Sequence, residues 1–218
     1  MRASTNKTMT DIRRIIKDVT DYYNARLSEF GPVPRGVDWN SKDSQELRFQ
    51  QLLNVVERES GHFTILDYGC GYGALFEFIK RNHPDFHYCG FDSSREMIEQ
   101  ANKLRRDTNC RWTSERDERE KYDYVVASGI LNVKLDRTET EWSDYVRQIL
   151  GQLNAAASKG FAFNILTKYS DAEFMKNNLY YADPCYYFDY CKKHFSRYVS
   201  LVHDYPLYEF TILVRKES

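Results

Sequence analysis

The sequence predicts an α/β protein built on a doubly wound, mostly parallel sheet of seven strands. A glycine-rich turn joins a short apolar strand to a helix, in the run Ile-Leu-Asp-Tyr-Gly-Cys-Gly-Tyr-Gly over residues 65–73. From Gly61 onward the apolar pattern alternates between strands and helices, which favours a parallel sheet covered on both faces. Two β-rich runs near the C-terminus leave no room for a helix between them, so an antiparallel hairpin completes the sheet.

The segment before Gly61 is expected to form two helices. Apolar residues between Thr10 and Phe30 recur at helical spacing, and Gly31 followed by Pro32 ends that helix. Residues 31–40 hold two prolines and two glycines and are expected to form a loop. A second helix begins near residue 43 or 44 and ends before Gly61. We expect residues 1–60 to form a helical lid over a ligand-binding domain of residues 61–218.

The alternating part of the chain supplies five strands and four helices. The strands are expected at residues 63–67, 86–91, 110–113, 122–127 and 161–166, and the helices at residues 74–82, 94–106, 139–158 and 186–194. Thr138 and Glu141 form a capping box at the start of the third of these helices. Residues 197–202 and 209–214 are the two strands of the closing hairpin.

The glycine turn indicates a nucleotide-like ligand. Gly69, Gly71 and Gly73 permit a tight turn and a close approach of the backbone to a ligand. Gly69, Gly71 and Ala74 also satisfy a dinucleotide fingerprint, so the glycines alone do not identify the ligand. Asp67 at the strand tip would repel a pyrophosphate and attract a cationic amino group.

A second acidic residue closes the next strand. Asp92 lies 21 residues beyond Gly71, the distance at which a carboxylate usually accepts hydrogen bonds from ribose hydroxyls. The two carboxylates together favour a ligand that has a ribose and an ammonium group and lacks a phosphate.

The two motifs resemble those of class I S-adenosylmethionine-dependent methyltransferases. They read Ile-Leu-Asp-x-Gly-Cys-Gly-x-Gly at residues 65–73 and Gly-Phe-Asp-Ser-Ser-x-x-Met-Ile-Glu-x-Ala at residues 90–101. The resemblance implies a Rossmann-like fold and S-adenosyl-L-methionine as the cofactor, with S-adenosyl-L-homocysteine as the product. It covers the chain from Gly61 to the C-terminus. The leader before Gly61 is similar to that of many bacterial methyltransferases whose substrates are unassigned.

The resemblance also assigns roles to residues near the strand ends. Asp67 and the Gly69-Cys70-Gly71 backbone are expected to hold the methionine part, and Asp92 the ribose. The remaining cofactor residues are Ser93 and Met97 beside the adenine, Ser114 and Glu115 near its exocyclic amine, and Ser128 and Gly129 beside the methionine and the transferred methyl group.

Arg48 is a further candidate for cofactor binding. It lies three residues after Gln45 and therefore shares a helix face with it. The carboxylate of the cofactor needs a cationic or amide partner, and arginine forms bidentate pairs with carboxylates. The alternative is that Arg48 is an exposed helix residue.

Composition excludes several function classes. A net charge of −1 gives no overall field that would recruit nucleic acid or an anionic membrane. No apolar run approaches the length of a membrane span, and the N-terminus does not resemble a secretory signal. Five cysteines without paired spacing argue against a disulfide framework and against a metal site. We therefore expect a cytoplasmic protein without a bound metal, as a monomer or homodimer.

Methyl transfer is an in-line displacement at a sulfonium, so the protein mainly has to align donor and acceptor and exclude water. An amine acceptor can react without a base, whereas a hydroxyl usually requires one. The candidates for a catalytic residue are His203, Tyr22 and Tyr181, followed by Tyr23, Asp183 and Asp204. Histidine titrates nearest neutral pH, although His203 at a strand end is equally well explained as a structural residue.

The sequence favours a small-molecule acceptor that is methylated on oxygen or nitrogen. The Asn/Asp-Pro-Pro-aromatic signature of enzymes that methylate nucleic-acid amino groups is absent after the fourth strand, where Ala-Ser-Gly-Ile stands at residues 127–130. No basic patch with interleaved aromatic residues indicates nucleic-acid binding. The alternatives are a catalytically silent, cofactor-binding regulatory or partner subunit, and an RNA or protein methyltransferase.

Overall fold

A single mixed sheet of seven strands organises the molecule. The computed structural model describes residues 2–56 and 61–217, with only the backbone for residues 2–11. The strands lie in the order β3-β2-β1-β4-β5-β7-β6. Neighbours from β3 to β5 pair parallel, and β7 is antiparallel to both β5 and β6. Their bounds are β1 (Phe63–Tyr68), β2 (Phe86–Phe91), β3 (Cys110–Thr113), β4 (Tyr122–Ala127), β5 (Ala157–Leu166), β6 (Tyr198–Val202) and β7 (Glu209–Arg215).

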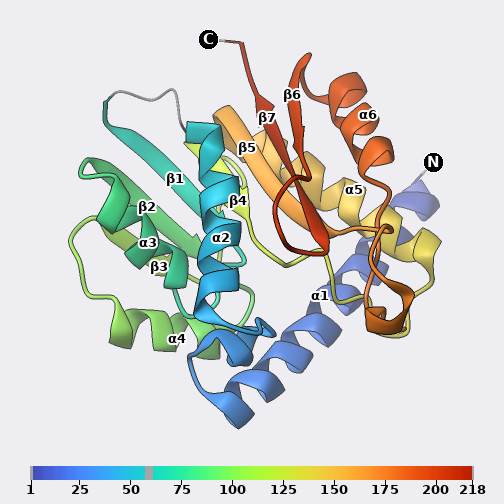
Figure 1. Ribbon diagram of the computed structural model, residues 1–218, viewed down its shortest axis with the longest axis horizontal. Coiled ribbons are helices and arrows are strands. Elements are labelled where there is room, and N and C mark those ends of the chain that lie inside the picture. The colour runs from blue at the N-terminus through green and yellow to red at the C-terminus, as the bar shows by residue number, and fades with distance from the viewer. Residues whose placement is uncertain (1, 57–60, 218) are drawn as a thin grey trace.

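Six α-helices are described, and they cover both faces of the sheet (Figure 1). They are α1 (Arg2–Phe30), α2 (Lys42–Leu53), α3 (Ala74–Asn82), α4 (Arg95–Leu104), α5 (Glu139–Ala156) and α6 (Pro184–His194). The described residues also form three short 3₁₀ helices, which are η1 (Pro34–Val37), η2 (Asn54–Val56) and η3 (Ala172–Phe174). The predicted fold class is confirmed, including the antiparallel hairpin. The second predicted helix ends at Leu53, and residues 57–60 lie outside the described part of the chain.

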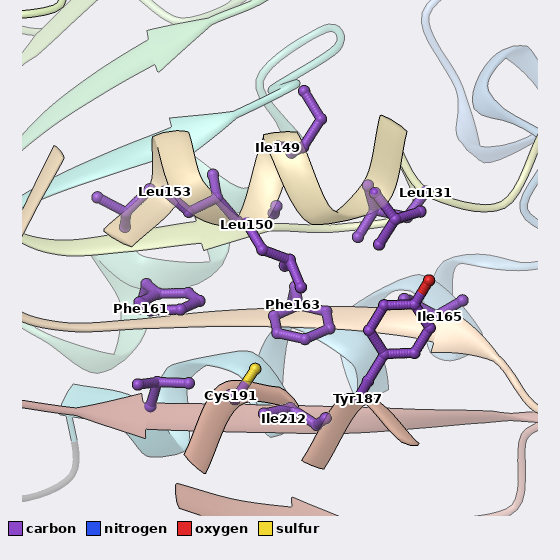
Figure 2. Close-up of a cluster of buried hydrophobic side chains, with 14 of the residues drawn as sticks. Leu131, Ile149, Leu150, Leu153, Phe161, Phe163, Ile165, Tyr187, Cys191 and Ile212 are labelled. Carbon is purple, nitrogen blue, oxygen red and sulfur yellow. The ribbon is translucent and has the colours of Figure 1, made fainter. Parts of the chain in front are cut away.

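One apolar core lies between the sheet and the helices α5, α6 and α1. Leu150 and Leu153 of α5 point onto Phe161 and Phe163 of β5, and α6 closes the layer over β7 (Figure 2). The core residue Ile15 brings α1 onto the same face, where it packs beside α5. Burial of large aliphatic and aromatic side chains stabilises such a layer by roughly 1.5–3 kcal/mol per side chain.

The second core lies on the other face, under α2 and α3. Phe49 and Leu52 of α2 pack with Leu75 and Ile79 of α3, above the strands β1 and β4. Because α1 and α2 cover opposite faces, the link between them, residues 31–41, has to cross an edge of the sheet. It crosses at the carboxyl ends of the strands, where parallel α/β proteins bind their ligands.

The boundary between α5 and β5 differs from the prediction. The predicted helix ends at residue 158 and the predicted strand begins at residue 161, whereas α5 ends at Ala156 and β5 begins at Ala157. Ala157 pairs with Tyr122, and a Cβ at Gly160 would lie 2.7 Å from the Val214 carbonyl oxygen. Pairing with β4 and β7 therefore overrides the local helical preference of this run. Within the described residues, no helix has the length and apolarity needed to cross a membrane.

Candidate active site

A pocket opens at the carboxyl ends of β1, β2 and β4, beneath the 31–41 link. It encloses about 1040 Å³, counted with the open solvent at its mouth. The lining residues are Ile16, Val19, Thr20 and Tyr23 from α1; Val37 and Trp39 from the link; Gln45 and Phe49 from α2; Asp67–Tyr72 and Ala74 around the glycine turn; Phe91–Ser94 and Met97 after β2; Ser128–Ile130 after β4; and Tyr145 and Ile149 from α5.

The glycine turn is held against the end of β2. The backbone N–H groups of Gly69 and Cys70 donate to the Phe91 carbonyl oxygen at 2.7 and 3.0 Å. Gly69 has φ +84°, and a Cβ on it would lie 2.2 Å from a methyl carbon of Ile130. Glycine is therefore required here, both for the positive φ and for the contact between the turns that follow β1 and β4. Burial raises the pKa of the Cys70 thiol well above its ordinary value, so this thiol is not a thiolate nucleophile.

Asp67 is the more deeply buried of the two acidic strand ends, with 3% of its surface exposed. Its Oδ2 accepts a hydrogen bond from the Tyr88 hydroxyl at 2.5 Å. Burial raises the pKa of Asp67 to about 7; the Tyr88 hydrogen bond acts in the opposite direction, and the nearby Asp92 adds to the increase. A cation bound beside this carboxyl group would favour its ionised form.

Asp92 lies beside the glycine turn and connects it to the start of α4. Its Oδ2 accepts from the Gly71 N–H and its Oδ1 from the Ser94 N–H, both at 2.9 Å. Burial raises the pKa of Asp92, while these two hydrogen bonds lower it. Among the described residues that line the pocket there is no lysine, arginine or histidine. The lining therefore favours a cationic ligand group and disfavours a phosphate.

Gln45 lies in the pocket lining, and Arg48 lies outside it. The Tyr72 hydroxyl donates to Gln45 Oε1 at 3.0 Å, which leaves the amide nitrogen of Gln45 free to donate. The Arg48 guanidinium is buried and donates to Glu209 Oε2 and to the Ser44 carbonyl oxygen, each at 2.8 Å. Arg48 is thus neither an exposed helix residue nor a lining residue, and Gln45 is the residue of this helix face that lines the pocket.

The other predicted cofactor residues divide into two groups. Ser93, Met97, Ser128 and Gly129 line the pocket, and the Ser128 hydroxyl is buried without a hydrogen-bond partner among the described residues. The structure does not bring Ser114 and Glu115 to the pocket.

The loop after β3 leads away from the pocket. The Thr113 hydroxyl donates to the Glu115 carbonyl oxygen at 2.6 Å, and the Glu115 side chain is exposed, 3.8 Å from Arg95. The apolar part of the pocket is lined by Tyr68, Phe91, Tyr145 and Ile149. The sequence pattern does not distinguish Tyr145 and Ile149 from core residues, because a helix face that packs and one that lines a pocket have the same apolar pattern.

Of the catalytic candidates, Tyr23 alone lies in the pocket lining among the described residues. The Tyr22 hydroxyl donates to Asp38 at 2.5 Å. Burial is the larger cause, and this hydrogen bond the next, of a rise in the pKa of Tyr22 to about 12. Tyr181 accepts from the Lys176 N–H at 2.9 Å in the loop after β5.

The remaining catalytic candidates, Asp183, His203 and Asp204, are also absent from the lining. Asp183 caps α6, and its carboxylate lies 2.7 Å from Lys168. His203 and Asp204 are exposed after β6, and the His203 ring packs against Tyr169 and Phe210. The structure therefore brings none of Tyr22, Tyr181, Asp183, His203 and Asp204 to the pocket.

Helix α1 is attached to the pocket rim by polar contacts. The Thr20 hydroxyl lies 2.7 Å from the Ser93 hydroxyl, and the Ser94 hydroxyl donates to Asn24 Oδ1 at 2.5 Å. On the link, Asp38 accepts from Arg26 Nε at 2.6 Å as well as from Tyr22. Asp38 has a left-handed backbone (φ 61°), which these contacts hold in place.

Two sequence comparisons identify the family. A family model described as a methyltransferase domain matches residues 66–160, which include the end of β1, the glycine turn and Asp92. A protein of Mycobacterium tuberculosis, named "Putative methyltransferase Rv1506c", is 49% identical over 161 residues, which cover 72% of this chain and 95% of that protein. The chain belongs to the methyltransferase family. The resemblance stated from the two sequence motifs is thereby confirmed.

Solved structures show the same fold for this methyltransferase. The complex described as DhpI-SAM-HEP has a TM-score of 0.62 at 16% identity, covering 93% of this chain and 98% of that chain. Magnesium protoporphyrin IX methyltransferase (ChlM) from Synechocystis PCC 6803 with bound SAH has a TM-score of 0.58 at 15% identity, covering 80% and 84%. The plantazolicin methyltransferase BpumL, in complex with a monoazolic desmethylPZN analog and SAH, has a TM-score of 0.57 at 16% identity, covering 94% and 99%. The methyltransferase therefore has the Rossmann-like methyltransferase fold.

The described residues of the methyltransferase contain no group of three or more histidine, cysteine, aspartate or glutamate side chains that could hold a metal ion.

Proposed function

We propose that this methyltransferase transfers the methyl group of S-adenosylmethionine to a small-molecule acceptor bound under the α1 helix and the 31–41 link. The observation that carries the proposal is the lining of the pocket. The buried carboxyl group of Asp67 and the half-buried one of Asp92 flank the glycine turn, and no described lysine, arginine or histidine lines the pocket. This charge pattern suits a ligand with an ammonium group, a sulfonium and a ribose, and it repels a dinucleotide.

The residues present fit this cofactor along the length of the pocket. Asp67 would hold the ammonium group, the Gln45 amide nitrogen the carboxylate, and Asp92 the ribose hydroxyls. The unpaired, buried Ser128 hydroxyl offers a further polar contact beside them. When bound, S-adenosylmethionine supplies an electrophilic methyl group on a sulfonium. The role of the protein is to bind the two reactants, to align them and to exclude water.

Enclosure of the pocket supports a small acceptor. Helix α1 and the link contribute apolar and aromatic walls, among them Tyr23 and Trp39, over the carboxyl ends of the strands. ChlM is named for magnesium protoporphyrin IX, and BpumL is bound to a desmethylPZN analog. A covered pocket of this kind admits a small molecule or a short peptide more readily than a folded RNA or protein. Among the described lining residues, Tyr23 is the one candidate for a catalytic base. Burial raises the pKa of its hydroxyl, which favours an acceptor that needs no strong base.

Titration calorimetry tests the cofactor. We expect S-adenosylmethionine and S-adenosylhomocysteine to bind with micromolar dissociation constants, about −8 kcal/mol. NADH should give no heat at the same concentrations, because its pyrophosphate would meet Asp67. Preferential binding of NADH would contradict the proposed function. Cofactor binding without turnover of any acceptor in a broad amine and phenol panel would instead favour the catalytically silent alternative.

Residues 1–60 are proposed to act as a lid, and hydrogen exchange measures this directly. We expect amides between Thr10 and Phe49 to exchange more slowly when S-adenosylhomocysteine is bound, because ligand contacts stabilise the closed arrangement of α1, the link and α2. Helix α6 does not contribute to the pocket lining and serves as the internal control. Equal exchange in the free and bound protein would show that the segment is a fixed wall.

A further inference from the structure

Arg48 and Glu209 form a buried ion pair behind the pocket. Neither side chain takes part in the proposed contacts with the cofactor. Arg48 is 7% exposed and Glu209 is fully buried, and Arg48 Nε donates to Glu209 Oε2 at 2.8 Å. Neither residue lines the pocket. Buried ion pairs contribute little net stability, because desolvation offsets their attraction, and in some proteins they fix the geometry of the groups around them.

One arm of this pair reaches the end of β4. Glu209 Oε1 accepts from Asn164 Nδ2 at 3.1 Å, and Asn164 Oδ1 accepts from the Gly129 N–H at 2.8 Å. An ionised carboxylate can only accept, so Asn164 has to present its nitrogen to Glu209 and its oxygen to Gly129. The charge on Glu209 thereby fixes the Gly129 backbone, which lines the pocket with φ +76°.

The other arm reaches the pocket wall. The Arg48 guanidinium lies over the Trp39 ring, 3.9 Å from the ring centroid, within the range of a cation–π contact. The same ring packs on Gly129, since a Cβ there would lie 2.3 Å from Trp39 Cζ2. Trp39 is therefore held between Arg48 and the Gly129 backbone, and Glu209 acts on both through its two oxygens.

We infer that Glu209 and Arg48 are positioning residues of this methyltransferase, which hold the Gly129 backbone and the Trp39 ring in the arrangement that receives the methionine end of the cofactor. The role assigned to these residues rests on the proposed function. Arg48 acts here through Trp39 and Glu209, without contact with the ligand.

The principal test replaces both charges at once with side chains of similar volume, Arg48→Met together with Glu209→Leu. Removing the two charges together avoids an uncompensated buried ion. We expect a folded protein that binds S-adenosylhomocysteine about tenfold or more weakly than the native chain. In two-dimensional NMR spectra of the free protein, the Gly129 amide and the Trp39 indole signals should move. The indole signals of Trp112 and Trp142, whose nitrogens donate to Arg105 and Leu131, should stay.

Arg48→Lys separates the two arms and remains informative if the double variant does not fold. Lysine keeps a charge for Glu209 but lacks the planar guanidinium that stacks on an indole. We expect the Gly129 amide signal to stay and the Trp39 indole signal to move, with a smaller loss of affinity. Arg111→Met with Glu120→Leu removes a partly exposed pair, 2.5 Å apart, that does not contribute to the pocket lining. This control should bind as the native chain does.

Three results would overturn the inference. In the first, both Arg48 variants bind S-adenosylhomocysteine within about twofold of the native chain, a difference too small to count as coupling. In the second, the Gly129 and Trp39 signals are unchanged; in the third, all indole signals move together, as for a general loss of structure. If the native chain itself does not bind S-adenosylhomocysteine, the proposed function fails, while the signals of the free protein still report whether residues 48 and 209 set the geometry of the β4 end.

Discussion

Replacing Asp67 by asparagine is expected to stabilise the free protein near neutral pH and to weaken cofactor binding at the same time. Burial raises the pKa of Asp67 to about 7, above its value in the unfolded chain. Its contribution to stability is therefore fully present at low pH and is lost as the pH rises through about 7. Asparagine has no ionised form, so the free variant should gain on the order of 2–4 kcal/mol at about pH 8.

The binding measurement has the opposite sign. If Asp67 contacts the ammonium group, the native chain should bind S-adenosylhomocysteine about tenfold more tightly at pH 8 than at pH 6, because the carboxylate is ionised only above its pKa of about 7. The variant should bind weakly and with little dependence on pH. Thermal unfolding and calorimetry at both pH values measure the two effects. Tight, pH-independent binding by the native chain would show that Asp67 does not contact the ammonium group.

Asp123 provides a control of opposite sign outside the pocket. Burial acts to raise the pKa of Asp123, but hydrogen bonds from Thr64 and the charge of Lys159 outweigh it and hold the pKa below its ordinary value. Asp123→Asn should therefore destabilise the protein above pH 4, where Asp67→Asn stabilises it, and it should leave cofactor binding unchanged. A gain in stability from both substitutions would indicate a general charge effect.

Asp92→Ala is expected to weaken binding of S-adenosylmethionine and S-adenosylhomocysteine at least about tenfold, through the loss of charge-assisted hydrogen bonds to the ribose, about 1.5–3 kcal/mol. The Gly71 N–H also loses its acceptor, so the glycine turn should become less ordered. The core should survive, because Asp92 lies outside both apolar clusters. Calorimetry gives the affinity and thermal unfolding the stability.

Asp92→Asn separates the two roles of this side chain. It keeps one acceptor oxygen and the shape of the carboxylate, so it should retain more of the turn and lose most of the charge-assisted binding. If Asp92→Ala binds the cofactor normally while its melting temperature collapses, Asp92 is a structural residue and the ribose lies elsewhere.

The catalytic candidates were chosen by residue type, which does not determine where a side chain lies in the fold. Tyr22, Tyr181 and His203 are chemically suitable, yet the structure commits them to Asp38, to the 174–176 loop and to aromatic packing. None of these three residues lines the pocket among the residues that the structure describes.

The sequence by itself determined the features that depend on short-range pattern. The glycine turn, the acidic ends of β1 and β2, and the closing antiparallel hairpin follow from residue spacing, because a turn requires its glycines locally and a strand presents its end at a known edge of the sheet. The family follows from the same two motifs, and the comparisons confirm it.

Only the tertiary structure decided which polar groups meet. Arg48 and Gln45 share a helix face, but Glu209, 161 residues further along the chain than Arg48, takes the arginine, and the amide is left facing the pocket. Likewise, pairing with β4 and β7 drew Ala157 and Ser158, which were predicted to end the helix, into a strand. The physical reason is the same in both cases. A buried charge or backbone group must find a partner, and that partner is set by the packing of distant elements, which no local pattern records.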